Sequence, residues 1–384
     1  MLLRCVTNDK THIAIVGAGI GGVALANALD RCGFQVSLLE QAETLSEIGA
    51  GLSIWENGLH ALEVLGLRGL VEAVGVAWPE YEIHRSGKPN VLRSTKVLSL
   101  DGTVPPLIIK RGKLFGVLLE SLSANVNVLS GFKVQGITGR TLISEDRRRL
   151  SADIIIGADG AHSRVRKELT QETPRFCNQI CYRGISPLAH HSAVVDADVF
   201  DQHHHRFSYF RLPDNQTYWF DIVDSNVPYE DFENHREYIE GLSPHIARLV
   251  KATPAKSILC HPIDEMPPVT VRSDYIALIG DAAHPMQPSL GQGACLALED
   301  AIVLAACLRD HADDLPKGLK AYLSKRKRRW GLYYKMCQQL GTGALDKGLR
   351  GRNMAIARMV HTPQWSMSLF GRPIFAFKER DISF

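Results

Sequence analysis

Three glycines, Gly17, Gly19 and Gly22, lie within the stretch "IAIVGAGIGGVALANAL" (residues 13–29), and their setting limits the fold more than any other feature. The apolar run "HIAIVG" before them is typical of a short strand that is covered on both faces. The residues after them, "GGVALANALDRCG", predict an amphipathic helix that Gly33 closes, and "QVSLLE" predicts the next strand. Together these segments predict a βαβ unit, and therefore an α/β domain with a parallel sheet.

The same order of strand, turn and helix recurs at residues 152–169 and 274–308. Between them, "HRFSYFRL" and "QTYWFDIV" predict a β-hairpin joined by the turn "PDNQ" (213–216). After Gly291, "ALEDAIVLAACL" and "LKAYLSKRKRRWGLYYKMCQQL" predict long helices. The expected fold class is therefore α/β, with a Rossmann-like nucleotide-binding domain made from discontinuous segments, an inserted antiparallel β-sheet substrate domain and a helical C-terminus. The expected boundaries are 11–75, 107–175 and 270–325 for the first domain, 76–106 and 176–269 for the second, and 326–384 for the C-terminal region.

The glycine spacing is that of a dinucleotide site. The first glycine allows a tight turn, the second lets a pyrophosphate approach the backbone, and the third lets helix and strand pack closely. Glu40 ends the next strand, where a carboxylate can accept hydrogen bonds from both ribose hydroxyls and disfavours a 2′-phosphate. We therefore expect FAD or NAD rather than NADP as the tightly held nucleotide, with a glycine turn that binds no ligand as the alternative.

Asp159 and Asp281 each follow an apolar run, in "IIIGADG" and "IALIGD". An aspartate at the carboxyl end of a parallel strand lies where such sheets bind ligands, and it can accept hydrogen bonds from a sugar or a ribityl chain. Each aspartate alone could equally be a helix cap. Their order after the glycine turn is what makes the set specific.

With this order and separation of motifs, the sequence resembles the single-component FAD-dependent aromatic hydroxylases of the para-hydroxybenzoate hydroxylase class. It is most similar to the branch that hydroxylates salicylate, urate and quinolones. The resemblance extends from His12 to about Trp330, and "GAGLSIWENGLHALEVLGL" (49–67) shares it, with Glu56 where a proline is usual.

The resemblance implies FAD as the bound cofactor, and NADH or NADPH as a transient co-substrate. It assigns the glycine turn to the pyrophosphate, Glu40 and its neighbour to the adenosine ribose, Val134 to the adenine, Asp159 to both FAD and nicotinamide, and Asp281 to the ribityl chain. A helix that begins near Gly291 would direct N–H groups and its positive end at the negative edge of reduced flavin. The cofactor-binding residues implied are Gly17, Gly19, Gly22, Glu40, Gln41, Arg111, Val134, Asp159, Gly280, Asp281, Pro288, Gly291, Gln292, Gly293 and Ala294.

The implied reaction uses O2 and a flavin C4a-hydroperoxide to hydroxylate a small aromatic substrate. Arg206 and Tyr218 occupy positions that face an anionic heteroaromatic in the urate-hydroxylating relatives. Alternatively, Arg206 is a surface strand residue and Tyr218 a core residue. His284 is interpreted as a loop-packing residue. Other chemistry on the same fold (epoxidation, oxidative decarboxylation or antibiotic inactivation) and a non-catalytic FAD-binding protein stay open.

Composition limits the partners. A net charge of +3 gives no support for a nucleic-acid partner, and "KRKRR" (325–329) is interpreted as a solvated helix face. The eight scattered cysteines are expected to be free thiols of a cytoplasmic protein, and no apolar run is long enough for a membrane helix. Consecutive histidines at 190–191 and 203–205 would chelate a metal poorly, so no metal is expected. The apolar tail 365–377 is expected to pack on the body, with a membrane or partner contact as the alternative, and the protein to be a monomer or homodimer.

Overall fold

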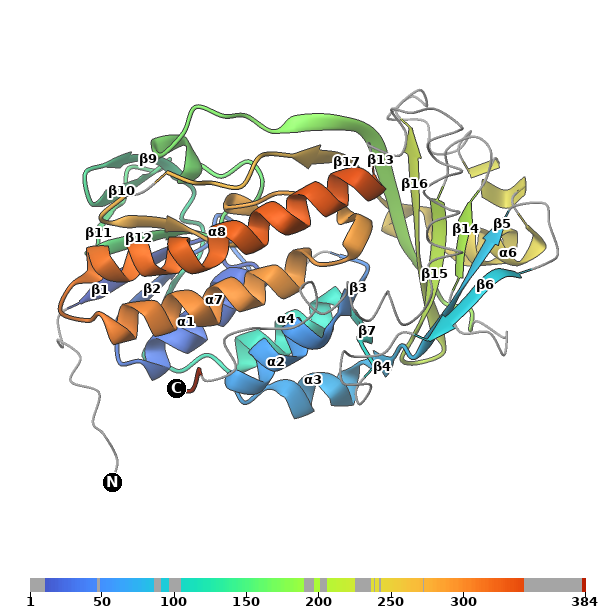
Figure 1. The fold of residues 1–384 in the computed structure, drawn as a ribbon, viewed down its shortest axis with the longest axis horizontal. Coiled ribbons are helices and arrows are strands. Elements are labelled where there is room, and N and C mark those ends of the chain that lie inside the picture. The colour runs from blue at the N-terminus through green and yellow to red at the C-terminus, as the bar shows by residue number, and fades with distance from the viewer. Residues whose placement is uncertain are drawn as a thin grey trace.

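A computed structural model describes residues 11–46, 49–85, 91–96, 105–189, 197–200, 206–224, 236–237, 239–241, 243–271, 273–341 and 382–384. The histidine pairs and triplet considered above, and the tail 365–377, lie outside these residues. Figure 1 shows an α/β body at one end of the molecule and a large sheet at the other.

The sheet of the body has five parallel strands in the order β18-β12-β1-β2-β8. Their bounds are His12–Val16 for β1, Gln35–Leu39 for β2, Asn127–Leu129 for β8, Ile154–Gly157 for β12 and Ile276–Leu278 for β18. In the central strand β1 every residue after His12 is buried, which confirms the expected cover on both faces. The predicted parallel sheet is therefore present.

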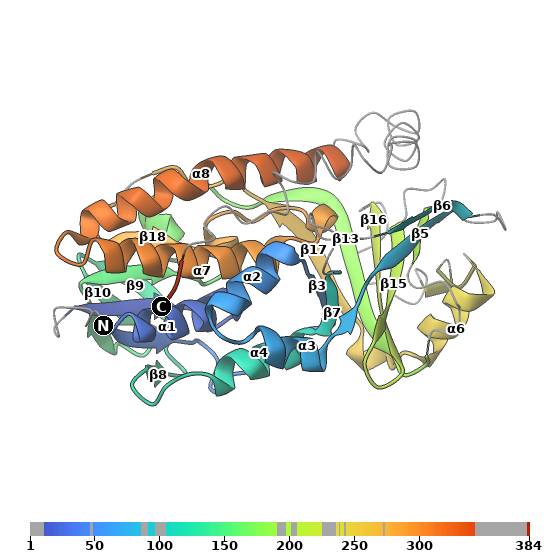
Figure 2. The same cartoon turned by 60° about the horizontal axis from the view of Figure 1, so that its bottom comes forward.

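Helices α1 (Ile20–Arg31) and α7 (Gly293–Asp310) pack together, and α8 (Leu315–Leu340) lies alongside α7 (Figures 1 and 2). Gly33 follows α1 with φ +83°, so it ends this helix as predicted. The other helices are α2 (Glu56–Val64), α3 (Arg68–Val74), α4 (Arg111–Glu120) and α6 (Pro244–Ala252), with 3-10 turns η1 (Arg166–Glu168), η2 (Ala255–Ser257), η3 (Gly280–Ala282) and η4 (Pro288–Leu290).

The large sheet has seven strands in the order β17-β13-β16-β15-β14-β5-β6. Their bounds are Glu80–Arg85 for β5, Val91–Lys96 for β6, Arg175–Ser186 for β13, Ala197–Phe200 for β14, Arg206–Leu212 for β15, Gln216–Asp224 for β16 and Leu259–Glu265 for β17. The predicted hairpin is confirmed as β15–β16, and Asp214 and Asn215 take the positive φ that its turn requires. The predicted antiparallel sheet is present, with one exception: β14 runs parallel to β5, which comes from a separate insertion.

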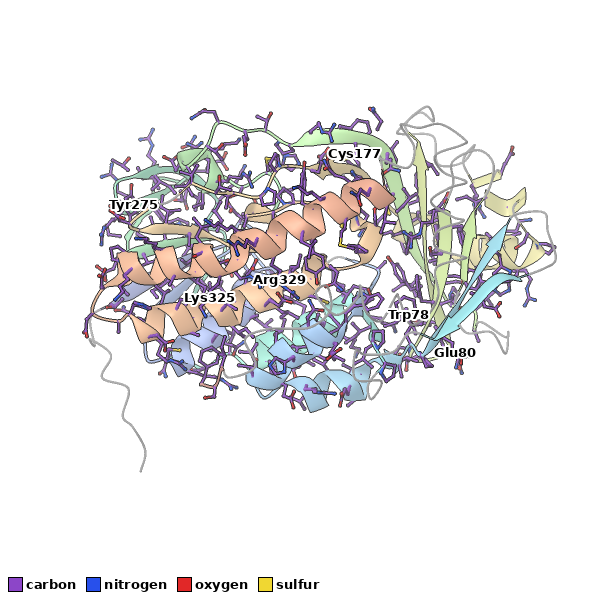
Figure 3. All side chains as sticks on the ribbon, viewed as in Figure 1. Trp78, Glu80, Cys177, Tyr275, Lys325 and Arg329 are labelled. Atoms are coloured by element: carbon purple, nitrogen blue, oxygen red, sulfur yellow. The ribbon has the colours of Figure 1, made fainter. Side chains whose placement is uncertain are left out.

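Two small sheets complete the fold. Strands β3 (Gly51–Ile54), β7 (Leu107–Lys110) and β4 (Val76–Ala77) form one, and β11 (Arg149–Ser151), β10 (Thr141–Ser144) and β9 (Val134–Thr138) form the other. The first lies where the body meets the large sheet. Trp78, labelled in Figure 3, is buried at this junction together with Ile108, Phe210 and Tyr218. The body and the large sheet therefore share an apolar core.

Helix α8 corrects the interpretation of "KRKRR". Lys325, Lys327 and Arg328 are exposed, but Arg326 and Arg329 face the body and form ion pairs with Glu299 (Figure 3 labels Lys325 and Arg329). Because one helical turn is 3.6 residues, five consecutive basic residues extend around the whole helix and cannot all face solvent when the helix lies on the body. Of the described helices, none is both long enough and apolar enough to cross a membrane.

Candidate active site

Four predicted ligand-binding residues lie at one edge of the parallel sheet. Gly17 follows β1, Glu40 follows β2, Asp159 lies just after β12, and Asp281 lies just after β18. Because these strands are parallel neighbours, their carboxyl ends meet at the same edge. The fold thus brings together residues that are up to 264 positions apart.

The glycine turn packs so closely against its own backbone that it has no room for side chains. Gly17 has φ +103°, and a Cβ on it would lie 2.4 Å from the carbonyl oxygen of Ala158. A Cβ on Gly22 would lie 2.0 Å from the carbonyl oxygen of Gly17. Gly19 is the N-cap of α1 and offers no side-chain cap, so the first N–H groups of the helix remain available to a ligand. This arrangement fits an anionic pyrophosphate.

The Glu40 carboxylate is oriented by two backbone groups. Its Oε2 accepts a hydrogen bond from Ala18 N at 2.9 Å, and its Oε1 accepts one from Ala42 N at 3.0 Å. Each oxygen keeps a second acceptor site, so the side chain can still accept from a ribose. Gln41 is exposed beside it.

Asp159 caps the turn that follows it. Its Oδ1 accepts from Ser163 Oγ at 2.5 Å, and its Oδ2 accepts from Arg164 N at 2.7 Å and Val165 N at 3.2 Å. Burial raises the pKa of this carboxyl more than these hydrogen bonds lower it. Asp159 therefore holds a turn and is not the N-cap of the following 3-10 helix, whose N-cap is Val165 without a side-chain cap. A contact of Asp159 with FAD or nicotinamide stays a prediction. Arg164 Nε also donates to Gln135 O at 2.5 Å, which places Val134 at the start of β9 close to this turn.

Two buried charged side chains, Asp300 and Arg166, hydrogen-bond the backbone of the turn that carries Asp281. Gly280 has φ +55°, and its N–H donates to Asp300 Oδ2 at 3.0 Å. The buried Arg166 donates through Nη1 to the carbonyl oxygens of Ala282 (3.3 Å) and Ala283 (2.9 Å). Asp281 itself is exposed, and a Cβ on Gly293 would lie 3.9 Å from its Oδ1. The carboxylate therefore lies beside the start of α7, free to accept from a ligand.

A buried ionic network, which the sequence analysis missed, lies behind this turn. Asp300 accepts from His284 Nε2 at 2.6 Å, Arg326 Nε at 2.7 Å and Trp330 Nε1 at 2.9 Å. Burial acts to raise the pKa of Asp300, but the charges of Arg326 and His284 outweigh it, and the pKa is lowered. The fully buried position of His284 agrees with its interpretation as a loop-packing residue.

Glu299 extends the network to the loop before α7. Its carboxylate pairs with Arg326 Nη1 at 2.7 Å and accepts from Arg329 Nε at 2.6 Å. Asn57 Nδ2 bridges Glu299 Oε1 at 2.7 Å and Gln292 Oε1 at 3.0 Å. The charged pairs between α7 and α8 are thus coupled to the Gly-Gln-Gly segment.

The loop from Pro288 to Gly293 approaches β3 closely. Gly291 has φ +61°, and a Cβ there would lie 2.7 Å from Ser53 Oγ. Gln292 is the N-cap of α7 without a side-chain cap, so the N–H groups of Gly293 and the half-buried Ala294 are available. A helix of 18 residues directs its positive end at this point.

Both predicted substrate-facing residues lie on the face of the large sheet that is turned toward the body. Arg206 Nη1 donates to Ser289 O at 3.4 Å, and its guanidinium carbon lies 5.6 Å from the ring centre of Phe220. Tyr218 packs against Gly51, where a Cβ would lie 2.6 Å from the ring. Burial raises the pKa of Tyr218, so the phenol stays protonated at neutral pH.

Arg111 lies next to this face. Its N–H donates to Ala50 O at 2.9 Å, and its side chain passes Gly49 so closely that a Cβ on that glycine would lie 2.5 Å from Arg111 Cδ. Its charge also lowers the pKa of Tyr218 against the larger effect of burial. The predicted cofactor arginine and the predicted substrate face therefore meet.

Aromatic side chains that the sequence analysis did not single out line the same junction. Trp55 lies 5.4 Å from Trp78, Trp78 lies 5.2 Å from Phe210, and Phe210 lies 5.9 Å from Phe220, measured between ring centres. Alternation along β15 and β16 places Phe210 and Phe220 on the face of Arg206 and Tyr218, a signal already present in the sequence. These rings form an apolar wall at the junction.

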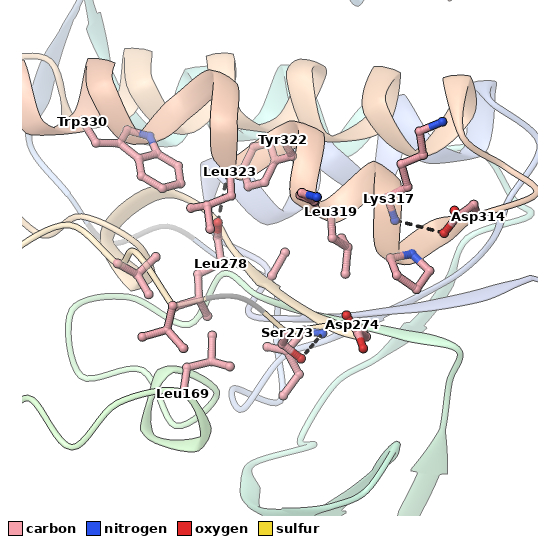
Figure 4. Close-up of a pocket in the computed structure, with 16 residues that line it drawn as sticks. Leu169, Ser273, Asp274, Leu278, Asp314, Lys317, Leu319, Tyr322, Leu323 and Trp330 are labelled. Atoms are coloured by element: carbon pink, nitrogen blue, oxygen red, sulfur yellow. Dashed lines mark hydrogen bonds between the residues drawn. The ribbon is translucent and has the colours of Figure 1, made fainter.

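Two cavities differ in their relation to this site. One of about 450 Å³ lies between Gly49 and Ala50 of the body and the ends of β13 and β17. Another, of about 480 Å³, lies under α8, where Leu319, Tyr322 and Leu323 point toward Leu278 (Figure 4). Neither cavity is lined by a predicted site residue, but the first adjoins the candidate site through Gly49, which the Arg111 side chain contacts.

Comparisons with known proteins match this geometry. A family described as "FAD binding domain" matches residues 10–332. The chain is 32% identical over 332 residues to "Aurachin C monooxygenase/isomerase" of Stigmatella aurantiaca, covering 83% of this chain and 85% of that protein. It is 31% identical over 337 residues to "FAD-dependent urate hydroxylase" of Mycolicibacterium vanbaalenii, covering 83% and 84%. The crystal structure of Klebsiella pneumoniae HpxO complexed with FAD and uric acid shares the fold, with a TM-score of 0.80 at 23% identity over 94% of this chain and 97% of that one.

Proposed function

The chain belongs to the FAD binding domain family, as its motifs predicted, and on that premise we propose that it is an FAD-dependent monooxygenase that uses NADH or NADPH and O2 to hydroxylate a small aromatic or heteroaromatic substrate. One observation carries the proposal furthest. The hydrogen bond from Arg206 to Ser289 O joins the sheet face predicted to hold the substrate to the loop predicted to lie beside the flavin. The two relatives, a monooxygenase/isomerase and a urate hydroxylase, support the same class of chemistry.

The sheet edge fits FAD. The glycine turn and the uncapped start of α1 suit the pyrophosphate, Glu40 with Gln41 suits the adenosine ribose, and the exposed Asp281 suits the ribityl chain. When bound, FAD supplies hydride acceptance and the activation of O2. The remaining residues proposed to hold it are Gly19, Arg111, Val134, Asp159, Gly280, Pro288, Gly291, Gln292, Gly293 and Ala294.

The chain's own groups then orient the reactants. The open N–H groups at the start of α7 stabilise negative charge that develops next to them. The rings of Trp55, Trp78 and Phe210 keep water out of the junction. The protonated Tyr218 donates a hydrogen bond, and Arg206 offers a guanidinium to an acidic substrate group.

The test is the consumption of NADH and NADPH by the purified yellow protein with small aromatic acids, purines and quinolones, with hydrogen peroxide assayed in parallel. A compound that accelerates oxidation with little peroxide, and yields a product heavier by one oxygen atom, supports hydroxylation. Acceleration with a product of another kind supports other chemistry on this fold. A protein that neither copurifies with flavin nor can be loaded with it contradicts the proposal.

The described cysteines suit a reducing compartment. Seven are free thiols, and six of these are buried. We therefore extend the proposal to a cytoplasmic location, in agreement with the sequence expectation. Size-exclusion chromatography with light scattering distinguishes the two expected states, monomer and homodimer.

A further inference from the structure

Helix α8 concentrates the positive charge of the molecule. Its 26 residues include five lysines and three arginines, and no aspartate or glutamate. Because α8 carries a formal charge of +8 and the whole chain only +3, the rest of the chain carries −5. The molecule is therefore polarised, with one basic helix on an otherwise acidic protein.

Two of these eight cations face the body, and six face away from it. Arg326 and Arg329 pair with Glu299, and Arg326 also pairs with Asp300. The other six side chains are exposed, and none of them forms a salt bridge within the described part of the chain. With 3.6 residues per turn, the six lie within an arc of about 160°, on the side of the helix opposite Arg326. They are Lys317, Lys320, Lys325, Lys327, Arg328 and Lys335.

An exposed leucine lies at the centre of this arc. Lys325, Arg328, Leu332 and Lys335 are three or four residues apart in sequence, so their side chains form one line along the helix. Leu332 is 38% exposed. In Figure 2 α8 runs along the upper edge of the body, so its outer side is turned away from the parallel sheet. We call the six exposed cations together with Leu332 the basic face.

The composition of the basic face favours a lipid surface over a nucleic acid. Five of its six cations are lysines, whose compact ammonium acts as a point charge, whereas the planar guanidinium of arginine suits the fixed geometry of a phosphate. A line of cations about 27 Å long, from Lys317 to Lys335, fits a planar surface. Anionic lipids of the cytoplasmic leaflet supply the complementary charge along this whole length. Leu332 can contact the boundary between headgroups and acyl chains.

We propose that the basic face of α8 docks the enzyme on the anionic surface of a lipid bilayer, as a peripheral protein. The apolar side of α8 stays on the body, where Tyr322 and Trp330 are buried, so the helix lies on the bilayer without inserting into it. The attraction is electrostatic and reversible, and it weakens as salt screens the charges. The inference concerns where the enzyme works and is independent of its substrate.

The experiment measures how the full-length, FAD-loaded enzyme partitions onto sedimented vesicles. One set of vesicles is pure phosphatidylcholine, and the other contains about one third phosphatidylglycerol. At about 0.05 M NaCl the wild type should bind the anionic vesicles at least about 100-fold more tightly than the neutral ones, and it should dissociate at about 0.5 M. The triple variant Lys325→Gln, Arg328→Gln, Lys335→Gln should bind about 100-fold more weakly, because each cation near an anionic bilayer contributes about five-fold.

A second triple variant with the same change in net charge is the matched control. Lys113→Gln, Lys167→Gln, Arg248→Gln removes two lysines and one arginine that are exposed on α4, η1 and α6. It should bind the anionic vesicles within about two-fold of the wild type, since charges further away than a Debye length contribute little. Both variants should keep the flavin content and the unfolding temperature of the wild type, because the replaced side chains form no salt bridge with the described residues.

The proposal is overturned if the wild type binds neutral and anionic vesicles equally. It is also overturned if the two triple variants lose binding to the same extent, because binding then depends on net charge and not on α8. Duplex DNA and polyglutamate are measured at the same salt; binding of either one to the basic face, without binding of anionic vesicles, contradicts a lipid partner. An enzyme that hydroxylates its substrate but does not bind vesicles contradicts only this proposal, whereas a protein that cannot be loaded with FAD contradicts the monooxygenase assignment.

Discussion

Replacing Asp300 by alanine should destabilise the protein and loosen its hold on FAD. The carboxylate accepts from the N–H of Gly280 and from the side chains of His284, Arg326 and Trp330, and all of these groups are buried. Breaking a buried ion pair on one side costs about 3–5 kcal/mol. Arg326 keeps Glu299 as a second partner at 2.7 Å, so we expect a loss near the lower limit, about 3–4 kcal/mol in the free energy of unfolding.

For a chain of 384 residues the entropy of unfolding is about 0.8 kcal/mol/K, so this loss lowers the melting temperature by about 4–5 °C. The assay is urea and thermal unfolding, with and without a fixed excess of FAD, because bound ligand itself raises stability. FAD content after gel filtration should also fall, since Gly280 loses the acceptor that fixes the Asp281 turn. Asp313→Asn, an exposed carboxylate between α7 and α8, is the control and should change the free energy by less than about 0.5 kcal/mol.

The pH dependence gives a second readout. The pKa of Asp300 is lowered in the folded protein, so its stabilising contribution is complete above the unfolded pKa of about 4 and is lost as the pH falls further. The difference in stability between wild type and Asp300→Ala should therefore shrink below about pH 4. A loss smaller than about 1 kcal/mol at neutral pH would refute the view that this network holds the turn.

Three further changes test the cofactor edge and the substrate face. Gly22→Ala places a Cβ 2.0 Å from Gly17 O, so α1 must move by about 1 Å and FAD retention should be lost, whereas Gly116→Ala, with nothing within 4 Å, should add about 0.5–1 kcal/mol of stability. Asp281→Asn should weaken FAD binding about ten-fold by fluorescence titration, yet leave the unfolding of the apoprotein within about 0.5 kcal/mol, because the side chain is exposed. Tyr218→Phe should lower the affinity for a ring hydroxyl or carboxylate about ten-fold without changing FAD content; equal affinities would place Tyr218 in the core only.

The parts of the site that follow from local sequence could be predicted. A positive φ at Gly17 and a strand that ends just before Glu40 depend on residues close by, and apolar runs with glycine turns show where parallel strands end. The carboxyl ends of neighbouring parallel strands lie at one edge of their sheet, so Gly17, Glu40, Asp159 and Asp281 could be placed together from the sequence alone. The hairpin after Leu212 followed from its turn residues for the same reason.

The network around Asp300 could not be predicted in this way. Whether Arg326 or Lys327 faces inward depends on how α8 rotates against α7, and that is set by the packing of Tyr322 and Trp330. The place of Arg183 of β13 on the same sheet face as Tyr218 could not be predicted for a similar reason, because it depends on strand register. Only the pairing of β13 with β16 reveals that it stands opposite Phe220.

The insertion of the large sheet has a consequence for synthesis on the ribosome. Strands β12 and β18 are neighbours, yet 122 residues separate Ile154 from Ile276. At 5–20 residues per second, β12 waits about 6–24 s for the partner that covers its edge. An unpaired apolar edge is a site of aggregation. Growth at a lower temperature, or a chaperone that holds nascent chains, should therefore raise the yield of folded enzyme.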